Sequence, residues 1–294
     1  MRIRIIDAFT DRPFAGNPAG VCLLDDGFPS DAWMQRVASE LNLSETAFAH
    51  PLPPGEDADW AIRWFTPVDE EVRLCGHATL ATAHALAASG PVRFRSLRSG
   101  VLVTRGNEDG SITLDFPAAT VTRIPQPAGL TEALGVAPES THTATVTDDL
   151  LAVLPDETAV REAAPDQAAL AALLTRESAR GLIVTAAARN HDAHGAHPAD
   201  GTKGADGTQV MGGTYDFVSR FFAPTAGIPE DPVTGSAHVS LAPFWSARLG
   251  RIALTALQAS PRTGLLHTSV HGDRVHLRGH AVTVLDGTLH SEPF

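Results

Sequence analysis

The sequence predicts an α+β protein of two related lobes, each a curled mixed sheet around one long helix. A motif recurs roughly half a chain apart, which indicates two duplicated lobes rather than a solenoid. Both copies end in a glycine turn that opens an apolar helical stretch, and strand-like stretches outnumber helical ones elsewhere. The two copies are Arg63-Trp64-Phe65-Thr66-Pro67 with Gly76-His77-Ala78, and Arg220-Phe221-Phe222-Ala223-Pro224 with Gly235-Ser236-Ala237.

Hydrophobic periodicity predicts the elements of the first half. Strands are expected where polar and apolar residues alternate, at Arg2–Ala8, Val21–Leu24, Thr46–His50, Trp60–Phe65 and several places between Val92 and Phe116. One helix is expected after Ser30-Asp31, with apolar residues at helical spacing. A second helix is expected over the alanine-rich Ala78–Ala88, closed by Gly90-Pro91.

The Pro-rich segment from Pro117 to Leu130 marks the expected boundary between the lobes. We therefore expect an N-terminal lobe at residues 1–117 and a C-terminal lobe at 118–294. The last strand of the second lobe is a candidate to cross back and join the first lobe. Pro243 is expected to bend or delay the last helix, which Gly250 closes as Gly90 closes its counterpart. The expected elements are strands at Val146–Leu154, Gly181–Ala187, Tyr215–Phe222 and within Ile252–Leu289, and helices near Asp166–Leu174 and Ala237–Leu249.

One segment of the second half is low in apolar residues. His191 to Gln209 is rich in Gly, Ala, Asp and His, and we interpret it as a mobile surface loop. His191, His194 and His197 recur every third residue, as metal ligands sometimes do, but glycine and proline argue against one rigid ligating face. Lys203 has no phosphate-loop pattern around it. We expect no metal site in the protein.

Composition excludes several classes of function. The 294 residues carry a net charge of −12, and there is only one Tyr and no basic-aromatic stripe, so nucleic acid is an unexpected partner. No apolar run approaches the ~20 residues of a membrane span, so no membrane partner is expected. Cys22 and Cys75 are too few for a disulfide framework. With a charged start that does not resemble a signal peptide, this predicts a cytoplasmic protein.

The paired glycine turns predict a site for a small acid. The free N–H groups of a helix's first turn, together with the helix dipole, suit a carboxylate, and glycine permits close approach. Gly76 and Gly235 from two lobes are therefore expected to grip one anionic substrate. Glu45 lies between apolar runs, where desolvation raises the pKa of a carboxyl toward that of a general acid/base. Taken singly, each of these residues also has an ordinary structural explanation.

Five ordered motifs identify a family resemblance that spans nearly the whole chain. They are Asp7-Ala8-Phe9-Thr10, Gly16-Asn17-Pro18-Ala19, Leu43-Ser44-Glu45-Thr46, Phe65-Thr66-Pro67 with Cys75-Gly76-His77-Ala78, and Glu230-Asp231-Pro232-Val233-Thr234-Gly235-Ser236-Ala237. Together they resemble the phenazine-biosynthesis isomerase-like (PhzF-like) family. The resemblance implies the diaminopimelate-epimerase-like fold, with a barrel-like sheet around a central helix in each lobe and the site between them. It also implies a homodimer without metal or organic cofactor.

The resemblance also implies roles for particular residues. Family members isomerise trans-2,3-dihydro-3-hydroxyanthranilate by moving a proton across the ring. Carried over by motif, Glu45 is the acid/base, and it is assisted by His77, Asp231 and Ser236. Backbone donors at Gly76 and Gly235 bind the substrate; Asn17, Cys75 and Thr234 complete the expected substrate-binding set. Related epimerases use one thiol from each lobe, and here the two positions are Cys75 and Thr234, so two-thiol racemisation is not expected.

The leading hypothesis is thus a cofactor-independent isomerase of a small carboxylate-bearing, possibly cyclic, substrate. Two alternatives stay open. The same fold could carry an epimerase or dehydratase of a hydroxylated amino acid, or the chain could be a non-catalytic small-ligand-binding dimer. The residues do not identify the substrate, because function depends on the lining of the site.

Overall fold

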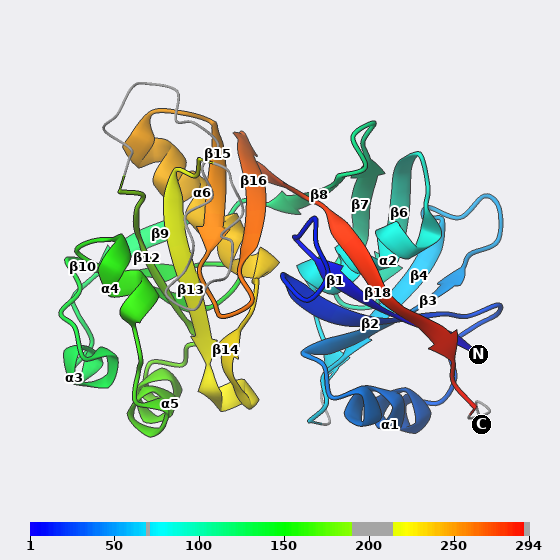
Figure 1. Ribbon diagram of the computed structural model, residues 1–294, viewed down its shortest axis with the longest axis horizontal. Coiled ribbons are helices and arrows are strands. Elements are labelled where there is room, and N and C mark those ends of the chain that lie inside the picture. Colours follow the sequence, from blue (N-terminus) through cyan, green and yellow to red (C-terminus); the bar gives the residue numbers. More distant parts are fainter. Residues whose placement is uncertain (69–70, 190–213, 291–294) are drawn as a thin grey trace.

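The structure, a computed structural model, describes residues 1–68, 71–189 and 214–290. Two lobes lie side by side (Figure 1). The elements up to the end of the first lobe are β1 (Arg2–Ala8), β2 (Asn17–Leu23), α1 (Asp31–Leu41), β3 (Glu45–Pro51), β4 (Trp60–Phe65), β5 (Glu71–Val72), α2 (Gly76–Leu86), β6 (Gly90–Ser96), β7 (Gly100–Gly106) and β8 (Ile112–Pro117).

The remaining elements begin directly after β8. They are β9 (Val121–Ile124), α3 (Leu130–Leu134), β10 (Ser140–Ala144), β11 (Asp149–Val153), α4 (Glu157–Glu162), α5 (Gln167–Arg176), β12 (Leu182–Ala187), β13 (Phe217–Ala223), the 3₁₀ turn η1 (Pro224–Ala226), β14 (Ile228–Asp231), α6 (Gly235–Leu249), β15 (Ala253–Gln258), β16 (Gly264–His271), β17 (Arg274–Gly279) and β18 (Ala281–Thr288). Among the described helices, none is long and apolar enough to cross a membrane.

The two lobes have the same strand order and the same strand directions. In the first lobe the paired order is β18-β1-β2-β3-β4-β6-β7-β8, and in the second it is β9-β10-β11-β12-β13-β15-β16-β17. The parallel pairs fall at matching places, β2–β3 and β4–β6 against β11–β12 and β13–β15. The half-chain repeat therefore corresponds to a repeated topology.

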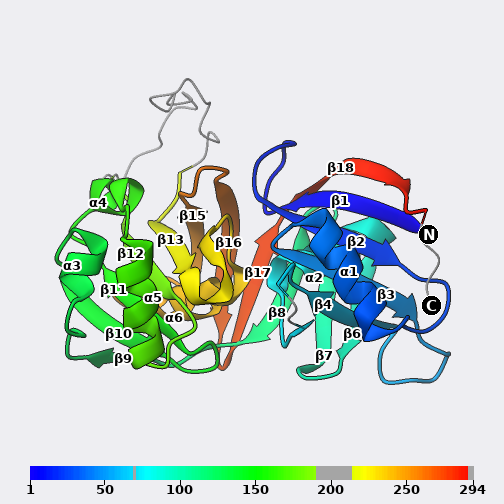
Figure 2. The ribbon, with the colours of Figure 1, turned by 90° about the horizontal axis from the view of Figure 1, so that it is seen from below.

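Strands that pass between the lobes join them. β8 and β17 pair antiparallel, so the sheet is continuous from one lobe to the other. After β8 the chain enters the second lobe as β9, and after β17 it returns as β18, which pairs with β1 along its length. Figure 2 shows this return: the chain passes from β17 into β18, which lies beside β1. The C-terminal half of the chain thus supplies β18 as an edge strand to the sheet of the first lobe.

A buried helix fills the interior of each curled sheet. α2 contacts β18, β1 and β2 at one end of the sheet order and β7 and β8 at the other, so the sheet wraps around it. Its alanines allow this close packing, and Ala78, Leu80 and Ala81 are fully buried. α1 lies outside the sheet, where Trp33 and Met34 pack with Phe48 in a separate apolar cluster.

Some element boundaries differ from those predicted. The left-handed residue that ends α2 is Ala87 (φ 49°), and Gly90 instead begins β6. α6 continues through Pro243, because the Val239 carbonyl that loses its helical donor accepts from the Ala119 N–H at 3.1 Å. The strand β10 and the short helices α3 and α4 were not predicted. The predicted loop of His191–Gln209 lies outside the described residues.

The arginines of the repeated motif have equivalent contacts in the two lobes. Arg63 holds both carboxylate oxygens of Glu71 at 2.7 and 2.8 Å, and Arg220 holds both of Glu230 at 2.7 Å. Each guanidinium also lies over the ring of a phenylalanine of its own strand, with its Cζ atom 5.1 Å from the ring centre of Phe65 or 5.0 Å from that of Phe222. Each pair ties the central strand to the strand that leads into the glycine turn.

We expect Arg220→Met to destabilise the protein by about 3–5 kcal/mol, because it leaves Glu230 and three main-chain carbonyls without their donor. Urea unfolding followed by circular dichroism measures the change. Arg176→Met, at a half-exposed arginine, is the control and should cost less than about 1 kcal/mol. Equal effects of the two substitutions would contradict a structural role for the repeated arginine.

Candidate active site

The two glycine turns meet between the lobes. A Cβ atom on Gly76 would lie 3.4 Å from Gly235 Cα, and a Cβ atom on Gly235 would lie 3.4 Å from Gly76 Cα. Any larger residue at either position would bring side-chain atoms into the space between the two helices. The close approach therefore places the first turns of α2 and α6 against each other.

Neither of these helices has a side-chain cap. Cys75 and Thr234 occupy the N-cap positions of α2 and α6, and neither makes a side-chain cap hydrogen bond. By contrast, Ser30, Asp156 and Asp166 cap α1, α4 and α5 through side-chain oxygens. First-turn N–H groups without a cap need another acceptor, and an anion meets that need.

Three of the predicted site residues meet at the start of α2. Glu45 begins β3, and its Oε2 lies 3.4 Å from Nε2 of His77. The other ring nitrogen of His77 lies 3.5 Å from the sulfur of Cys75. The Glu45 side chain is 16% exposed, whereas that of His77 is 5% exposed. Of the two side chains, that of Glu45 is the more accessible to a ligand.

Burial determines the protonation of this group. It lowers the pKa of His77 to about 4, against the opposing effect of the Asp231 charge, so the ring is neutral at pH 7. Burial, together with the nearby carboxylate of Glu45, raises the pKa of the Cys75 thiol well above its usual value. Cys75 is therefore a protonated thiol, and this position carries no thiolate base.

The same three residues include metal-ligand types. One ligand atom from each of Glu45, Cys75 and His77 lies within 4.8 Å of the others. The thiol also interacts with the Glu45 carboxylate, so the three side chains contact one another. A metal ion binds cysteine as a thiolate, and the raised pKa of the Cys75 thiol disfavours that form. We interpret the group as a set of polar contacts.

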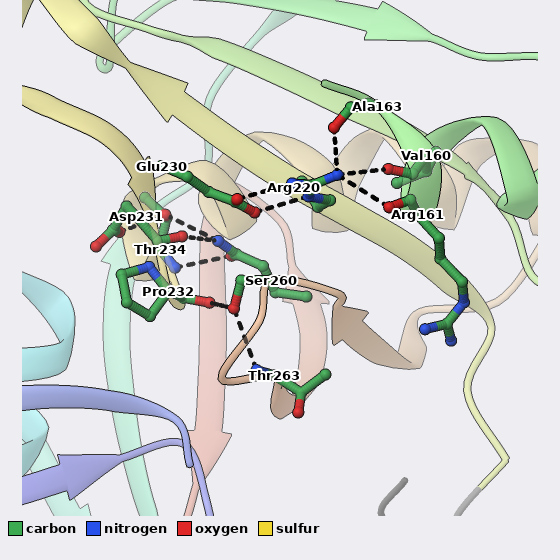
Figure 3. Close-up of polar contacts among 11 residues, drawn as sticks. Val160, Arg161, Ala163, Arg220, Glu230, Asp231, Pro232, Thr234, Ser260 and Thr263 are labelled. Atoms are coloured by element: carbon green, nitrogen blue, oxygen red, sulfur yellow. Dashed lines mark hydrogen bonds and ion pairs between the residues drawn. The ribbon is translucent and has the colours of Figure 1, made fainter. Parts of the chain in front are cut away.

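A second set of predicted residues meets at the start of α6. Asp231 accepts from the hydroxyl of Thr234, as Figure 3 shows. It also accepts from Asn17 Nδ2 at 2.8 Å. Asn17 is fully buried and also donates to the carbonyl of Val233 at 2.9 Å. This bond pair joins β2 of the first lobe to the α6 turn of the second. Asn17 therefore contacts the site through Asp231.

Sequence reasoning missed the residues that support this turn. Gln258 is fully buried; its Oε1 accepts from Thr234 N and its Nε2 donates to the Asp231 carbonyl, both at 2.8 Å. Ser260 donates to the carbonyl of Pro232 at 2.7 Å (Figure 3). Gln258 is the last residue of β15 and Ser260 follows it by two residues, so both are far from the turn in sequence. No local pattern marks them.

A clasp between the lobes was also missed. Arg262 donates to Asp7 Oδ1 at 2.8 Å and to the Gly16 carbonyl at 2.9 Å. Main-chain bonds from Gly16 N to Thr263 O and from Leu265 N to Phe9 O continue this contact. The residues Asp7, Phe9 and Gly16 lie in the motifs quoted above, so the motifs hold the lobes together beside the site.

Ser236, the last predicted residue, lies in the first turn of α6. Its hydroxyl accepts from Arg180 Nη2 at 2.9 Å. Arg180 precedes β12 and was not predicted. The carboxylates of Asp149, Asp231 and Glu45 raise the pKa of Arg180, and its bond to Ser236 places the guanidinium beside the first turn of α6.

Comparison with known proteins decides the family. The family model described as phenazine biosynthesis-like protein matches residues 6–287. The chain belongs to the phenazine biosynthesis-like protein family. An uncharacterized isomerase from Pseudomonas aeruginosa is 44% identical over 289 residues, covering 97% of each chain. A phenazine biosynthesis-like domain-containing protein from Homo sapiens is 38% identical over 304 residues, covering 98% of each.

Solved structures of the phenazine biosynthesis-like family have the same fold. A PhzF family protein from Enterococcus faecalis superposes with a TM-score of 0.80 at 38% identity, covering 97% of each chain. A predicted epimerase from Pseudomonas aeruginosa, at 20% identity and a TM-score of 0.73 over 99% of each chain, shares the fold. These findings confirm the predicted resemblance and the predicted α+β fold class.

The buried His77 predicts a pH effect on stability. Its folded pKa, about 4, lies below the ordinary 6.5, so between these pH values the unfolded chain binds a proton that the folded chain does not. Stability is therefore full above about pH 6.5 and falls as the pH drops toward 4. The shift corresponds to roughly 3 kcal/mol.

Between pH 7.5 and 4.5, we expect the free energy of unfolding of His77→Gln to fall by roughly 3 kcal/mol less than that of the wild type. Urea unfolding at both pH values measures the difference. His238 has the same lowered pKa, so a comparable loss remains in the variant. His290→Gln, at an exposed position, should leave the loss unchanged. An identical pH dependence in wild type and His77→Gln would contradict the buried neutral imidazole.

Proposed function

We propose that this chain is an isomerase that moves a proton within a small carboxylate-bearing substrate, with Glu45 as the general acid/base. The observation that supports this most strongly is the position of Glu45. Its partly exposed carboxylate adjoins the uncapped first turn of α2, which faces the uncapped first turn of α6. An acid held at those turns would lie next to a group that can take a proton from it.

The proposed reaction has two proton transfers. Glu45 takes a proton from one carbon of the substrate, and the electron pair of that C–H bond passes into the adjacent unsaturated system. The N–H groups of the two helices stabilise the negative charge that develops. Glu45 then returns the proton to another carbon. Because Glu45 carries the proton in both transfers, we propose that no metal or organic cofactor takes part.

His77 suits both states of Glu45. Nε2 lies 3.4 Å from Oε2 without a hydrogen bond, so a small rotation of the ring would let the tautomer with hydrogen on Nε2 donate to a Glu45 carboxylate, while Nδ1 faces the Cys75 thiol as an acceptor. When Glu45 holds the substrate's proton, the other tautomer leaves Nε2 as an acceptor. A neutral ring makes this possible, because an imidazolium would donate from both nitrogens. Asp231 and Ser236 are proposed to orient the substrate.

A two-base epimerase receives less support. Such an enzyme needs a second acid/base from the opposite lobe, and the equivalent position of Cys75 is Thr234. The hydroxyl of Thr234 donates to Asp231, and its amide is held by Gln258. The Cys75 thiol is itself protonated and buried. One carboxyl that both removes and returns a proton fits the site better.

We expect Glu45→Gln to lower activity about 10²–10⁴-fold, because an amide cannot carry the proton. The measurement is isomerisation of trans-2,3-dihydro-3-hydroxyanthranilate, together with deuterium uptake from D₂O by a panel of cyclic and aromatic amino acids. Glu40→Gln, on the exposed face of α1, is the matched control and should retain full activity.

Near wild-type turnover and exchange by Glu45→Gln would contradict the proposed role. Ligand binding without proton exchange in the wild-type protein would favour the non-catalytic alternative. Loss of water from a product would instead indicate a dehydratase.

A further inference from the structure

Arg180 is the cationic group that the proposed reaction leaves unexplained. It lies between α5 and β12, on the lobe opposite Glu45, and Nη2 donates to Ser236 in the first turn of α6. Burial by itself would lower the pKa of Arg180, but the carboxylates of Asp149, Asp231 and Glu45 outweigh it and raise the pKa. The bond to Ser236 places the guanidinium beside the first turn of α6, which faces the first turn of α2 in the other lobe.

Asp149 holds the guanidinium in one orientation. It accepts from Nε at 2.9 Å and from Nη2 at 2.7 Å, a two-bond contact that fixes the plane of the group. Asp149 is fully buried, and the guanidinium lies 5.0 Å from the ring of Phe221. The Arg180 side chain is nevertheless 41% exposed. Within the part of the chain that the structure describes, its Nη1 has no hydrogen-bond partner.

Two other observations at this place indicate a ligand. Nε2 of His77 is buried and has no hydrogen-bond partner in the described structure, although Glu45 lies 3.4 Å away. The first turns of α2 and α6 lack side-chain caps. Glu45 and Asp231 repel an incoming anion, so the helix termini need added positive charge to hold one. Arg180, already bonded to Ser236, supplies that charge.

We propose that Arg180 binds the carboxylate of the substrate through Nη1, beside the first turns of α2 and α6, and that Asp149 positions it. This inference rests on the proposed function, because it concerns the same small acid. It adds a requirement for a charged carboxylate. An amide of the same shape offers the guanidinium no anionic oxygen. We therefore expect Arg180 to be the residue that makes the protein bind an acid more tightly than its amide.

The test compares acid and amide ligands by titration calorimetry. The probes are anthranilate, benzoate and L-proline, each with its amide. We expect Arg180→Lys to weaken acid binding about tenfold, because the ammonium keeps the charge but loses the fixed Nη1. The double variant Asp149→Asn/Arg180→Met should weaken it about tenfold to a hundredfold. It removes both members of the buried pair, so no unpaired charge compromises folding.

Amide binding is the readout that separates recognition from general damage. In both variants the affinity for the amides should change less than twofold, and Arg176→Met should leave acid binding unchanged. Equal weakening of acid and amide, or no weakening of the acid, would overturn the inference about Arg180 alone. A wild-type protein that binds none of the acids would contradict the proposed function and this inference together.

Discussion

The contact between Gly76 and Gly235 is the constraint on which the site depends. A Cβ atom added to either glycine would already touch the other turn, at 3.4 Å from its Cα atom, so a larger side chain at either position would project into the space between the helices. Three contacts hold the lobes together around it: the pairing of β18 with β1, the pairing of β8 with β17, and the bond from Arg262 to Asp7. As a result, two helix N-termini of the same polarity are held together, and an anion between them relieves their repulsion.

Burial then divides the polar groups around that contact into two kinds. His77 and Cys75 lie deep enough to lose their charged forms, so they act as neutral hydrogen-bonding groups. Glu45 remains partly exposed, and Arg180 has an exposed edge, so these two groups are able to meet a ligand from opposite lobes. Asn17, Gln258 and Asp149 are fully buried and hold the others in place. In the proposed reaction, this division would leave Glu45 and Arg180 to contact the substrate while the buried groups keep them in position.

Local patterns in the sequence predicted much of the fold, and several residues that they singled out lie around the two glycine turns. Ser30 and Asp166 mark the starts of two helices, and in the structure their side chains accept hydrogen bonds from the N–H groups of the first turn. The paired glycine turns indicated the contact between lobes. Arg180 and Asp149 were not predictable in this way, because the parallel pairing of β11 with β12 brings them together. Nor does any local signal show that Ala119 would support the helix at Pro243. The homodimer and the cytoplasmic location stay predictions.

The most direct test of this account is a crystal structure of the protein with a bound substrate or acid analogue. We expect the ligand's carboxylate within hydrogen-bond distance of first-turn N–H groups from both α2 and α6, with its reacting carbon beside Glu45 Oε2. A ligand bound elsewhere, or one that contacts only a single lobe while Gly76 and Gly235 remain together, would contradict the central claim.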